Sequence, residues 1–152
     1  AADCDADGRA DLLVGYLVVE GGARFAGIDL LLARDGRYDV VTLLYEPGRE
    51  PVRALAVGDL DGDRAADVVA LRGDGTTLLF PSGSPERMSV HAPPAWRRGC
   101  SGYGLRLGDL DGDGRPEVFA SFAGEPSAYD LGEPSCVDGG GIEAWAVVPA
   151  AP

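Results

Sequence analysis

Three segments of this 152-residue chain carry acidic residues at positions 1, 3, 5 and 9 of a nine-residue stretch. Four carboxylates this close together repel one another strongly unless a cation lies among them. Ligands that are all oxygen suit a hard cation, and Ca²⁺ is favoured over Mg²⁺ because the pattern demands no water-rich octahedral site. The carbonyl oxygen of position 7 adds a further ligand. We therefore predict up to three Ca²⁺ ions, with these candidate ligands: Asp3, Asp5, Asp7, Arg9 and Asp11 in loop 1; Asp59, Asp61, Asp63, Ala65 and Asp67 in loop 2; Asp109, Asp111, Asp113, Arg115 and Glu117 in loop 3.

The EF-hand is the alternative calcium loop with a similar acidic spacing. An EF-hand needs a bidentate Glu at position 12 and a helix on each side of the loop. Position 12 is Val14, Ala70 or Ala120 in the three loops, and residues that favour β-strands follow each of them. The pattern therefore excludes the EF-hand on two independent grounds.

The acidic loops recur at spacings of 56 and 50 residues, and each is followed by a short run of strand-forming residues. Loops 2 and 3 are also preceded by segments that alternate apolar residues with polar or small ones, VRALAVG and GYGLRLG, which is the period of a half-buried strand. We find no stretch with convincing helical periodicity. Beyond these two segments, strands are predicted over residues 12–16, 28–33, 38–45, 68–71, 76–80, 88–91, 118–122 and 142–148.

One unit therefore contains four short antiparallel strands in about fifty residues, which is typical of a propeller blade. The predicted fold is all-β, a β-propeller segment of about three four-stranded antiparallel blades that do not close a ring. The chain is expected to be a single domain with blades over about 1–50, 51–98 and 99–152, and its first unit lacks the strand before its loop. Because closed propellers need about four to eight blades, we expect a fragment, or a chain that completes its ring with further blades or another copy.

The chain has a net charge of −12, and all 13 of its basic residues are arginine. This charge argues against DNA, RNA or an anionic membrane surface as a partner. No apolar run approaches the length of about 18 residues that a membrane-spanning helix needs.

The segment GDLDGDGRPEVF and its two counterparts resemble the FG-GAP/VCBS repeats of integrin-α-type β-propellers. The resemblance implies Ca²⁺ bound by the carboxylates at positions 1, 3, 5 and 9 and by the carbonyl at position 7. It also implies a non-catalytic recognition or adhesion scaffold that is secreted or exposed on the cell surface and binds a protein or glycan. Two residues depart from the motif. Arg64 replaces Gly in loop 2, where a left-handed turn would cost about 1 kcal/mol and bring a cation close by, whereas Glu117 replaces Asp in loop 3 with a longer side chain that can still reach. We therefore rank loops 1 and 3 above loop 2 in affinity.

An enzyme-associated role is the alternative, with the propeller attached to a secreted hydrolase whose catalytic part lies elsewhere. Within these residues we find no nucleophile–base pair, and the single histidine, His91, is not accompanied by a nucleophile elbow. We therefore predict no enzymatic activity for this segment. The adhesion-like tripeptide Arg72-Gly73-Asp74 is interpreted as a plain hairpin turn, and the aromatic residues as packing between blades rather than a ligand-binding face.

The three cysteines have no zinc-site spacing. Cys100 and Cys136 flank the core strands of the third unit and are candidates for a disulfide, which would agree with an oxidising compartment. Cys4 occupies position 2 of loop 1, where the other loops have leucine. This parallel favours a buried small apolar residue over half of a disulfide to a residue elsewhere.

Overall fold

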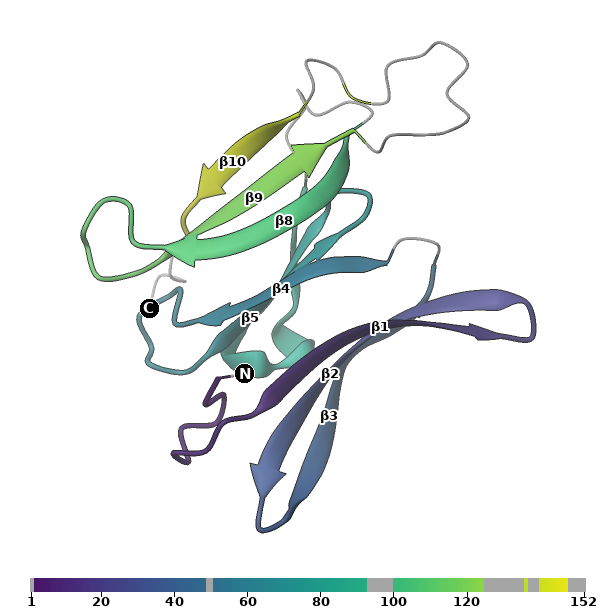
Figure 1. Ribbon diagram of the computed structural model, residues 1–152. Coiled ribbons are helices and arrows are strands. Elements are labelled where there is room, and N and C mark those ends of the chain that lie inside the picture. The colour runs from purple at the N-terminus through teal and green to yellow at the C-terminus, as the bar shows by residue number, and fades with distance from the viewer. Residues whose placement is uncertain (1, 49–50, 93–99, 125–135, 137–139, 148–152) are drawn as a thin grey trace.

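The structure is a computed structural model that describes residues 2–48, 51–92, 100–124, 136 and 140–147. These residues form three antiparallel sheets and contain no α-helix (Figure 1). The prediction of an all-β, propeller-like segment is confirmed. The predicted blade boundaries at 50/51 and 98/99 involve residues outside the described ranges, so they stay predictions.

The three sheets correspond to the three units of the repeat. The first has the strand order β1-β2-β3, the second β4-β5-β6-β7 and the third β10-β9-β8. Two short 3-10 turns, η1 (Pro81–Gly83) and η2 (Pro85–Arg87), join β6 to β7. The strands are β1 (Leu12–Glu20), β2 (Ala23–Arg34), β3 (Arg37–Pro47), β4 (Val52–Gly58), β5 (Asp67–Arg72), β6 (Thr77–Phe80), β7 (Ser89–His91), β8 (Ser101–Gly108), β9 (Glu117–Ala123) and β10 (Gly141–Trp145).

The hairpin between β1 and β2 is longer than predicted. Strand β1 continues to Glu20 and β2 begins at Ala23, whereas the sequence pattern placed the corresponding bounds at 16 and 28. Gly21 and Gly22 form the turn with φ of 58° and 85°, a left-handed conformation that glycine adopts without steric cost. The hairpin therefore projects beyond the other sheets, to the right in Figure 1.

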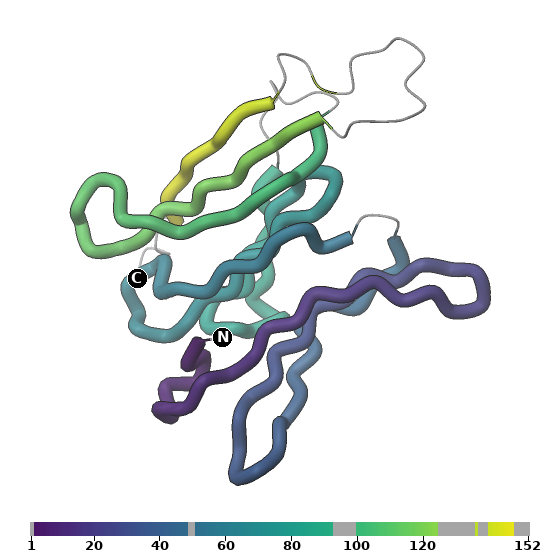
Figure 2. Tube along the Cα trace, viewed as in Figure 1, coloured from purple at the N-terminus to yellow at the C-terminus, as the bar shows by residue number. Residues whose placement is uncertain are grey.

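Strand β5 lies at the centre of the molecule because its two faces belong to two different cores (Figure 2). Val68 and Ala70 pack toward the first sheet, and Val69 and Leu71 pack toward the third; all four are fully buried. A strand buried on both faces reads as a continuous apolar run rather than an alternating one, as the sequence of β5 does. The apolar cores between neighbouring sheets hold the three units together.

Two further contacts tie the second sheet to its neighbours. Arg72 Nη1 lies 2.6 Å from Glu46 Oε1 on β3, and the Gly102 N–H donates to the Gly73 carbonyl at 3.0 Å. The tripeptide Arg72-Gly73-Asp74 thus lies at the β5–β6 turn, where it is packed between blades. On the outer strands, the His91 ring stacks on Trp145 with centroids 4.2 Å apart and contacts Glu143 at 3.2 Å.

Cys100 and Cys136 form a disulfide. Cys4 is free and half-buried, and burial raises the pKa of its thiol.

Trp145 contacts His91 across two sheets, in agreement with a packing role, while Trp96 and Tyr129 lie outside the described residues.

Candidate metal centres

The three acidic loops occupy equivalent places in the three sheets. Loop 2 (residues 59–67) joins β4 to β5, loop 3 (residues 109–117) joins β8 to β9, and loop 1 (residues 3–11) leads into β1. All three lie on the same side of the stacked sheets, on the left in Figures 1 and 2. Loops 2 and 3 therefore precede a central strand of their sheets, whereas loop 1 precedes β1, which is an edge strand among the described residues.

The same set of hydrogen bonds shapes each loop. The carboxylate at position 1 accepts from the backbone N–H of position 6, at 2.9, 2.9 and 3.0 Å in loops 1, 2 and 3. The carboxylate at position 3 accepts from the N–H of position 5, and that at position 5 accepts from the N–H of position 7. Such carboxylate-to-backbone bonds two residues apart are Asx turns, which curl the chain tightly. The acidic side chains therefore stabilise the curled backbone of each loop in addition to giving the loop its negative charge.

The curled backbone requires left-handed conformations at positions 4 and 6. Position 4 has φ of 82° at Gly62 and 80° at Gly112, but in loop 1 the residue is Ala6, with φ of 59°. Position 6 is glycine in loops 1 and 3, whereas loop 2 has Arg64 with φ of 71°. A non-glycine residue in this region costs about 1 kcal/mol or more. The left-handed turn expected at Arg64 is present; the requirement at position 4 was not anticipated.

The acid at position 9 anchors the loop to the sheet in loops 1 and 2. Asp11 and Asp67 are fully buried, with 0% and 1% of their surface exposed. Each accepts from the N–H of position 2, at 2.7 Å from Cys4 and 2.8 Å from Leu60. The second oxygen of each accepts a backbone N–H from the far end of the following hairpin, at 2.8 Å from Ala33 near the end of β2 or from Ser82 just after β6.

Loop 3 keeps only the first of these anchors among the described residues. Glu117 accepts from the Leu110 N–H at 2.6 Å, so its longer side chain does reach the position 2 backbone. Leu110 itself is 70% exposed, whereas Leu60 is 1% exposed at the same position. Loop 3 is therefore less embedded in its sheet than loop 2.

The carboxylates converge closely enough to hold a cation. One oxygen from each of three acids lies within 4.8 Å of the others in every loop. Two oxygens bound to one Ca²⁺ at about 2.3–2.6 Å can be no more than about 5 Å apart, so the donor set and its spacing fit that ion. The convergent acids are Asp3, Asp5 and Asp11 in loop 1; Asp59, Asp61 and Asp67 in loop 2; Asp109, Asp111 and Asp113 in loop 3.

Not every candidate ligand belongs to these groups. Asp7, Asp63 and Glu117 lie outside them, although their carboxylates accept backbone N–H groups as those of the convergent acids do. The position 7 residues contribute backbone N–H groups to the loop hydrogen bonds; coordination by their carbonyl oxygens stays a prediction. Those position 7 residues are Arg9, Ala65 and Arg115.

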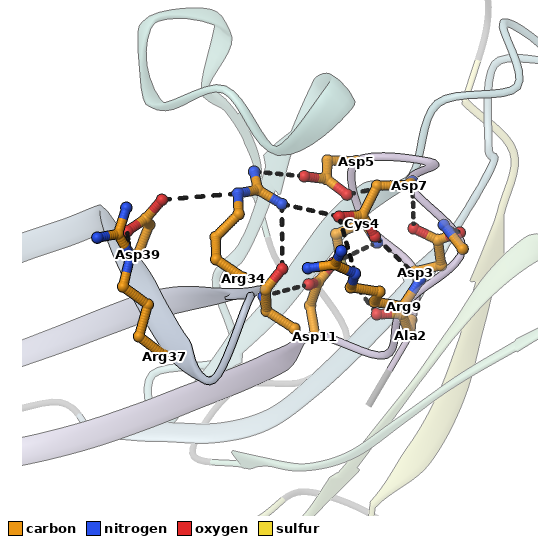
Figure 3. A network of polar contacts seen from close by, with 12 residues as sticks. Ala2, Asp3, Cys4, Asp5, Asp7, Arg9, Asp11, Arg34, Arg37 and Asp39 are labelled. Atoms are coloured by element: carbon orange, nitrogen blue, oxygen red, sulfur yellow. Dashed lines mark hydrogen bonds and ion pairs between the residues drawn. The ribbon is translucent and has the colours of Figure 1, made fainter.

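Arginine side chains already neutralise part of the charge in loops 1 and 3. At the end of β2, Arg34 contacts Asp5 at 2.6 Å and Asp7 at 2.9 Å, and Figure 3 shows its guanidinium between these acids and Asp39. Arg34 lowers the pKa of Asp5 by a charge-assisted hydrogen bond. In loop 3, Arg115 contacts Asp113 at 2.6 Å and lowers the pKa of that carboxyl in the same way.

Loop 2 has a different electrostatic environment. Burial raises the pKa of Asp67, and the N–H groups of Ser82 and Leu60 oppose this effect by stabilising the carboxylate. The acids Asp61 and Asp63 raise it further by repulsion. A cation bound beside Asp67 would remove this cost because it would supply the missing opposite charge.

No local pattern in the sequence indicated the groups that reach the loops from the far end of the next hairpin. Arg34 is 27 residues from Asp7, and Ser82 is 19 residues from Asp63, whose carboxylate its hydroxyl contacts at 3.2 Å. Ser82 and Ala33 donate to equivalent acids, so Arg34 corresponds to Gly83 in the second sheet. Alignment of the loops does not reveal that loop 1 has an arginine beside it where loop 2 has a glycine. Only alignment of the hairpins that follow the loops would have indicated this.

Comparison with known proteins gives one match. Residues 59–120 match the family model described as FG-GAP-like repeat. No curated protein and no solved structure matches the chain. No helix of the described residues combines the length and apolar character needed to cross a membrane. FG-GAP repeats are a non-catalytic repeat family typical of extracellular proteins. Residues 59–120, from loop 2 into β9, therefore match an FG-GAP-like repeat, in agreement with the resemblance noted in the sequence.

Proposed function

We propose that this chain is a calcium-stabilised, non-catalytic scaffold that works outside the cell and presents its loops to a protein or glycan partner. One observation carries the calcium part of the proposal: three separate loops bring carboxylate oxygens within 4.8 Å of one another by the same backbone arrangement. A single exposed acidic cluster would mean little. Three equivalent ones on one side of a repeat point to a shared ligand.

The ion would act as a structural link rather than a catalyst. Loop 2 joins β4 to β5, and its convergent carboxylates come from both ends of the loop, so an ion held by them would fix that connection. In loop 3 the convergent carboxylates come from the first five residues, so an ion there would hold the turn itself. A ligand present at one hundred times its Kd stabilises the folded state by about 2.7 kcal/mol per site. Three Ca²⁺ ions would also halve the net charge of −12, which relieves repulsion along that side of the molecule.

An extracytoplasmic location is supported by two features. The disulfide between Cys100 and Cys136 suits an oxidising compartment. Calcium loops of this kind would also bind calcium in an extracellular fluid, because calcium at about 10⁻³ M reaches or exceeds the Kd of about 10⁻⁴–10⁻³ M typical of extracellular modules. Secretion or display on the cell surface therefore agrees with both the redox and the metal chemistry.

Recognition is assigned to a protein or glycan because the acidic surface repels polyanions. Stacked sheets form a rigid frame, and rigid frames present exposed loops with little loss of conformational entropy on binding. An adhesive role is the form of recognition that the resemblance to integrin-α-type repeats implies.

Calorimetric titration of the purified chain with CaCl₂ after chelation tests the calcium proposal. The informative variants replace position 3 in one loop at a time, Asp5→Asn, Asp61→Asn or Asp111→Asn, because each removes one charge from a convergent group. Glu20→Gln serves as the control, since that exposed side chain lies at the far end of β1 from loop 1 and outside the three groups. Each loop variant should lose one binding event and the control none. Equal binding by all four variants would contradict the assignment.

A further inference from the structure

One arginine of the first sheet lies against the acids of loop 1. Arg34 Nη2 lies 2.6 Å from Asp5 Oδ2, and Arg34 Nη1 donates to Asp7 Oδ2 at 2.9 Å. The contacts are partly shielded from solvent, because the three side chains are only 25–32% exposed. A guanidinium that contacts two carboxylates at once supplies positive charge where the loop would otherwise take it from a metal ion.

The sheet fixes the position of this arginine. Arg34 is the last residue of β2 and pairs with Arg37 of β3. The residue before it, Ala33, donates its backbone N–H to Asp11 of the loop at 2.8 Å, and Arg34 Nη1 donates to the Ala33 carbonyl at 3.2 Å. The guanidinium is therefore held beside the loop, so it loses less side-chain entropy on meeting the acids than a freely rotating arginine would.

Arg34 competes with calcium because both use Asp5. Asp5 belongs to the convergent group of loop 1, together with Asp3 and Asp11. Its Oδ2 lies 2.6 Å from the guanidinium, and its Oδ1 accepts from the Asp7 N–H at 3.3 Å. A Ca²⁺ ion bound by Asp5 at about 2.3–2.6 Å would lie close to the guanidinium, and two cations at that separation repel each other. The ion and the arginine therefore exclude each other at this acid.

Arg34 has a second acidic partner, which lies outside the loop. Its Nε is 3.5 Å from Asp39 Oδ2 on β3, on the opposite side of the guanidinium from Asp5 in Figure 3. Rotation of the side chain can thus move the guanidinium from Asp5 to Asp39 while the strand stays in place. In loop 2 the place of Arg34 is taken by Gly83, and Asp63 accepts from the neutral Ser82 hydroxyl at 3.2 Å.

We propose that Arg34 is a built-in cation of loop 1, which holds this loop folded without calcium and which calcium must displace from Asp5. Loop 1 then alternates between an arginine-held state and a calcium-held state, and it fills after loops 2 and 3. This order differs from the one that the loop sequences indicate, because Arg34 lies outside the acidic motif. The inference rests on the proposed function, since it assigns the regulation of one of the same three calcium sites.

Calcium binding by loop 1 is measured separately once Asp61→Asn and Asp111→Asn have removed position 3 acids from loops 2 and 3. In this background, Arg34→Gln should tighten calcium binding about tenfold in calorimetric titration, because it frees Asp5 and removes a like charge. Arg24→Gln is the matched control. It removes the same charge from an exposed side chain near the other end of β2, so it should change the affinity by less than about twofold.

Without calcium, the same substitution should loosen the loop. The backbone N–H groups of Asp7, Gly8 and Arg9 donate to acids of loop 1. In chelator they should exchange hydrogen about tenfold faster in Arg34→Gln than in the unsubstituted chain or in Arg24→Gln. In saturating calcium this difference should disappear, because the ion then takes over the role of the guanidinium.

The NMR signal of the Arg34 Nε–H group reports the displacement in the unsubstituted chain. It should change with the last equivalents of calcium and not with the first, because loop 1 fills last. This measurement needs no variant, so it stays decisive even where Arg34→Gln impairs folding.

The possible failures are distinguishable. Equal calcium affinity of Arg34→Gln and Arg24→Gln, or an Arg34 signal that does not respond to calcium, would overturn the inference while calcium binding by loops 2 and 3 still supports the proposed function. Unchanged hydrogen exchange of Arg34→Gln in chelator would show that the arginine does not hold the loop, and would overturn the inference as well. No calcium bound by any loop would contradict the proposed function and, with it, this inference.

Discussion

Loops 2 and 3 have closely similar sequences, DLDGDRAAD and DLDGDGRPE, yet they relate to their sheets differently. In loop 2 the ninth residue, Asp67, is buried and accepts two backbone N–H groups. In loop 3 the ninth residue, Glu117, accepts one and lies outside the convergent group of acids. Loop 2 therefore depends on its ninth acid to anchor it to the sheet, whereas loop 3 is a more exposed turn whose ninth acid makes one such hydrogen bond.

This difference separates two roles that one motif combines. An acid that accepts buried N–H groups contributes to stability whether or not a metal is bound, because those donors have no water to bond instead. An acid on an exposed turn contributes mainly when a cation is present. Stability without calcium and affinity for calcium should therefore respond to different residues in the two loops.

The largest expected effect is on stability without calcium. Asp67→Ala leaves the N–H groups of Leu60 and Ser82 without an acceptor and should lower the free energy of unfolding by about 3 kcal/mol. Glu117→Ala removes one more exposed acceptor and should lower it by about 1 kcal/mol. Urea unfolding in the presence of chelator measures both. Equal losses would break the distinction between the loops.

A smaller effect is expected from the left-handed residue at position 6. Arg64→Gly should raise the free energy of unfolding by about 1 kcal/mol, because Arg64 has φ of 71° and glycine does not resist that conformation. The reverse change, Gly114→Arg in loop 3, should lower it by about the same amount, since Gly114 has φ of 88°. Thermal unfolding in chelator compares the pair. Destabilisation by glycine at position 64 would show that the arginine side chain makes a stronger compensating contact.

The response of calcium binding to pH should also separate the loops. Burial raises the pKa of Asp67, so protons compete with the cation in loop 2 at a higher pH than at an ordinary carboxyl. Arg115 lowers the pKa of Asp113, so that acid of loop 3 stays ionised further into the acidic range. On acidification from pH 7, loop 2 should lose calcium first.

Titrations at successive pH values, with the other sites removed by position 3 substitutions, would measure this order. The same shifts predict opposite trends in stability without calcium. Asp67 favours the proton in the folded state, so its contribution to stability falls as pH rises from its unfolded pKa through its raised folded pKa. Asp113 contributes stability above its unfolded pKa that is lost as pH falls through its lowered folded pKa. Loss of calcium from loop 3 before loop 2 would contradict the assignment.

The smallest effect concerns the arginine of loop 3. Arg115→Gln removes the cation that contacts Asp113 at 2.6 Å, so calcium should bind loop 3 about twofold to fivefold more tightly. The pair is exposed, and salt screens it, so the gain should shrink as ionic strength rises. Calorimetry at two salt concentrations checks both points; weaker binding by the glutamine variant would indicate that Arg115 supports the loop rather than competing with the ion.

The strand pattern of this chain was predictable because the acidic loop and the strand-forming run that follows it occur three times. The run Val68 to Leu71 and the alternating segment from Val52 to Gly58 are strands in the structure, as expected. The long β1–β2 hairpin was not predicted, because its residues alternate weakly and the Gly21-Gly22 turn was passed over. Hairpin length depends on pairing between two strands, which the pattern of either strand alone does not determine.

Within the loops, the candidate cation ligands were predictable from the sequence. Which of these acids also anchor the loop to the sheet was not. The spacing of the acids indicated a cation site, and the three convergent groups agree with it. The anchoring role of Asp11 and Asp67 was missed because their N–H partners, Ala33 and Ser82, come from the far end of the next hairpin. Arg34 was missed for the same reason, since its approach to Asp5 depends on the register of β1 with β2. Contacts made through the sheet have no local signal in the sequence.

Calorimetric titration with CaCl₂, paired with thermal unfolding in millimolar calcium and in chelator, tests the central claim most directly. The account predicts two to three ions bound per chain and a clear rise in Tm with calcium, because each filled loop stabilises the folded state. No heat of binding together with an unchanged Tm would contradict it and leave three acidic turns on a β-sheet frame.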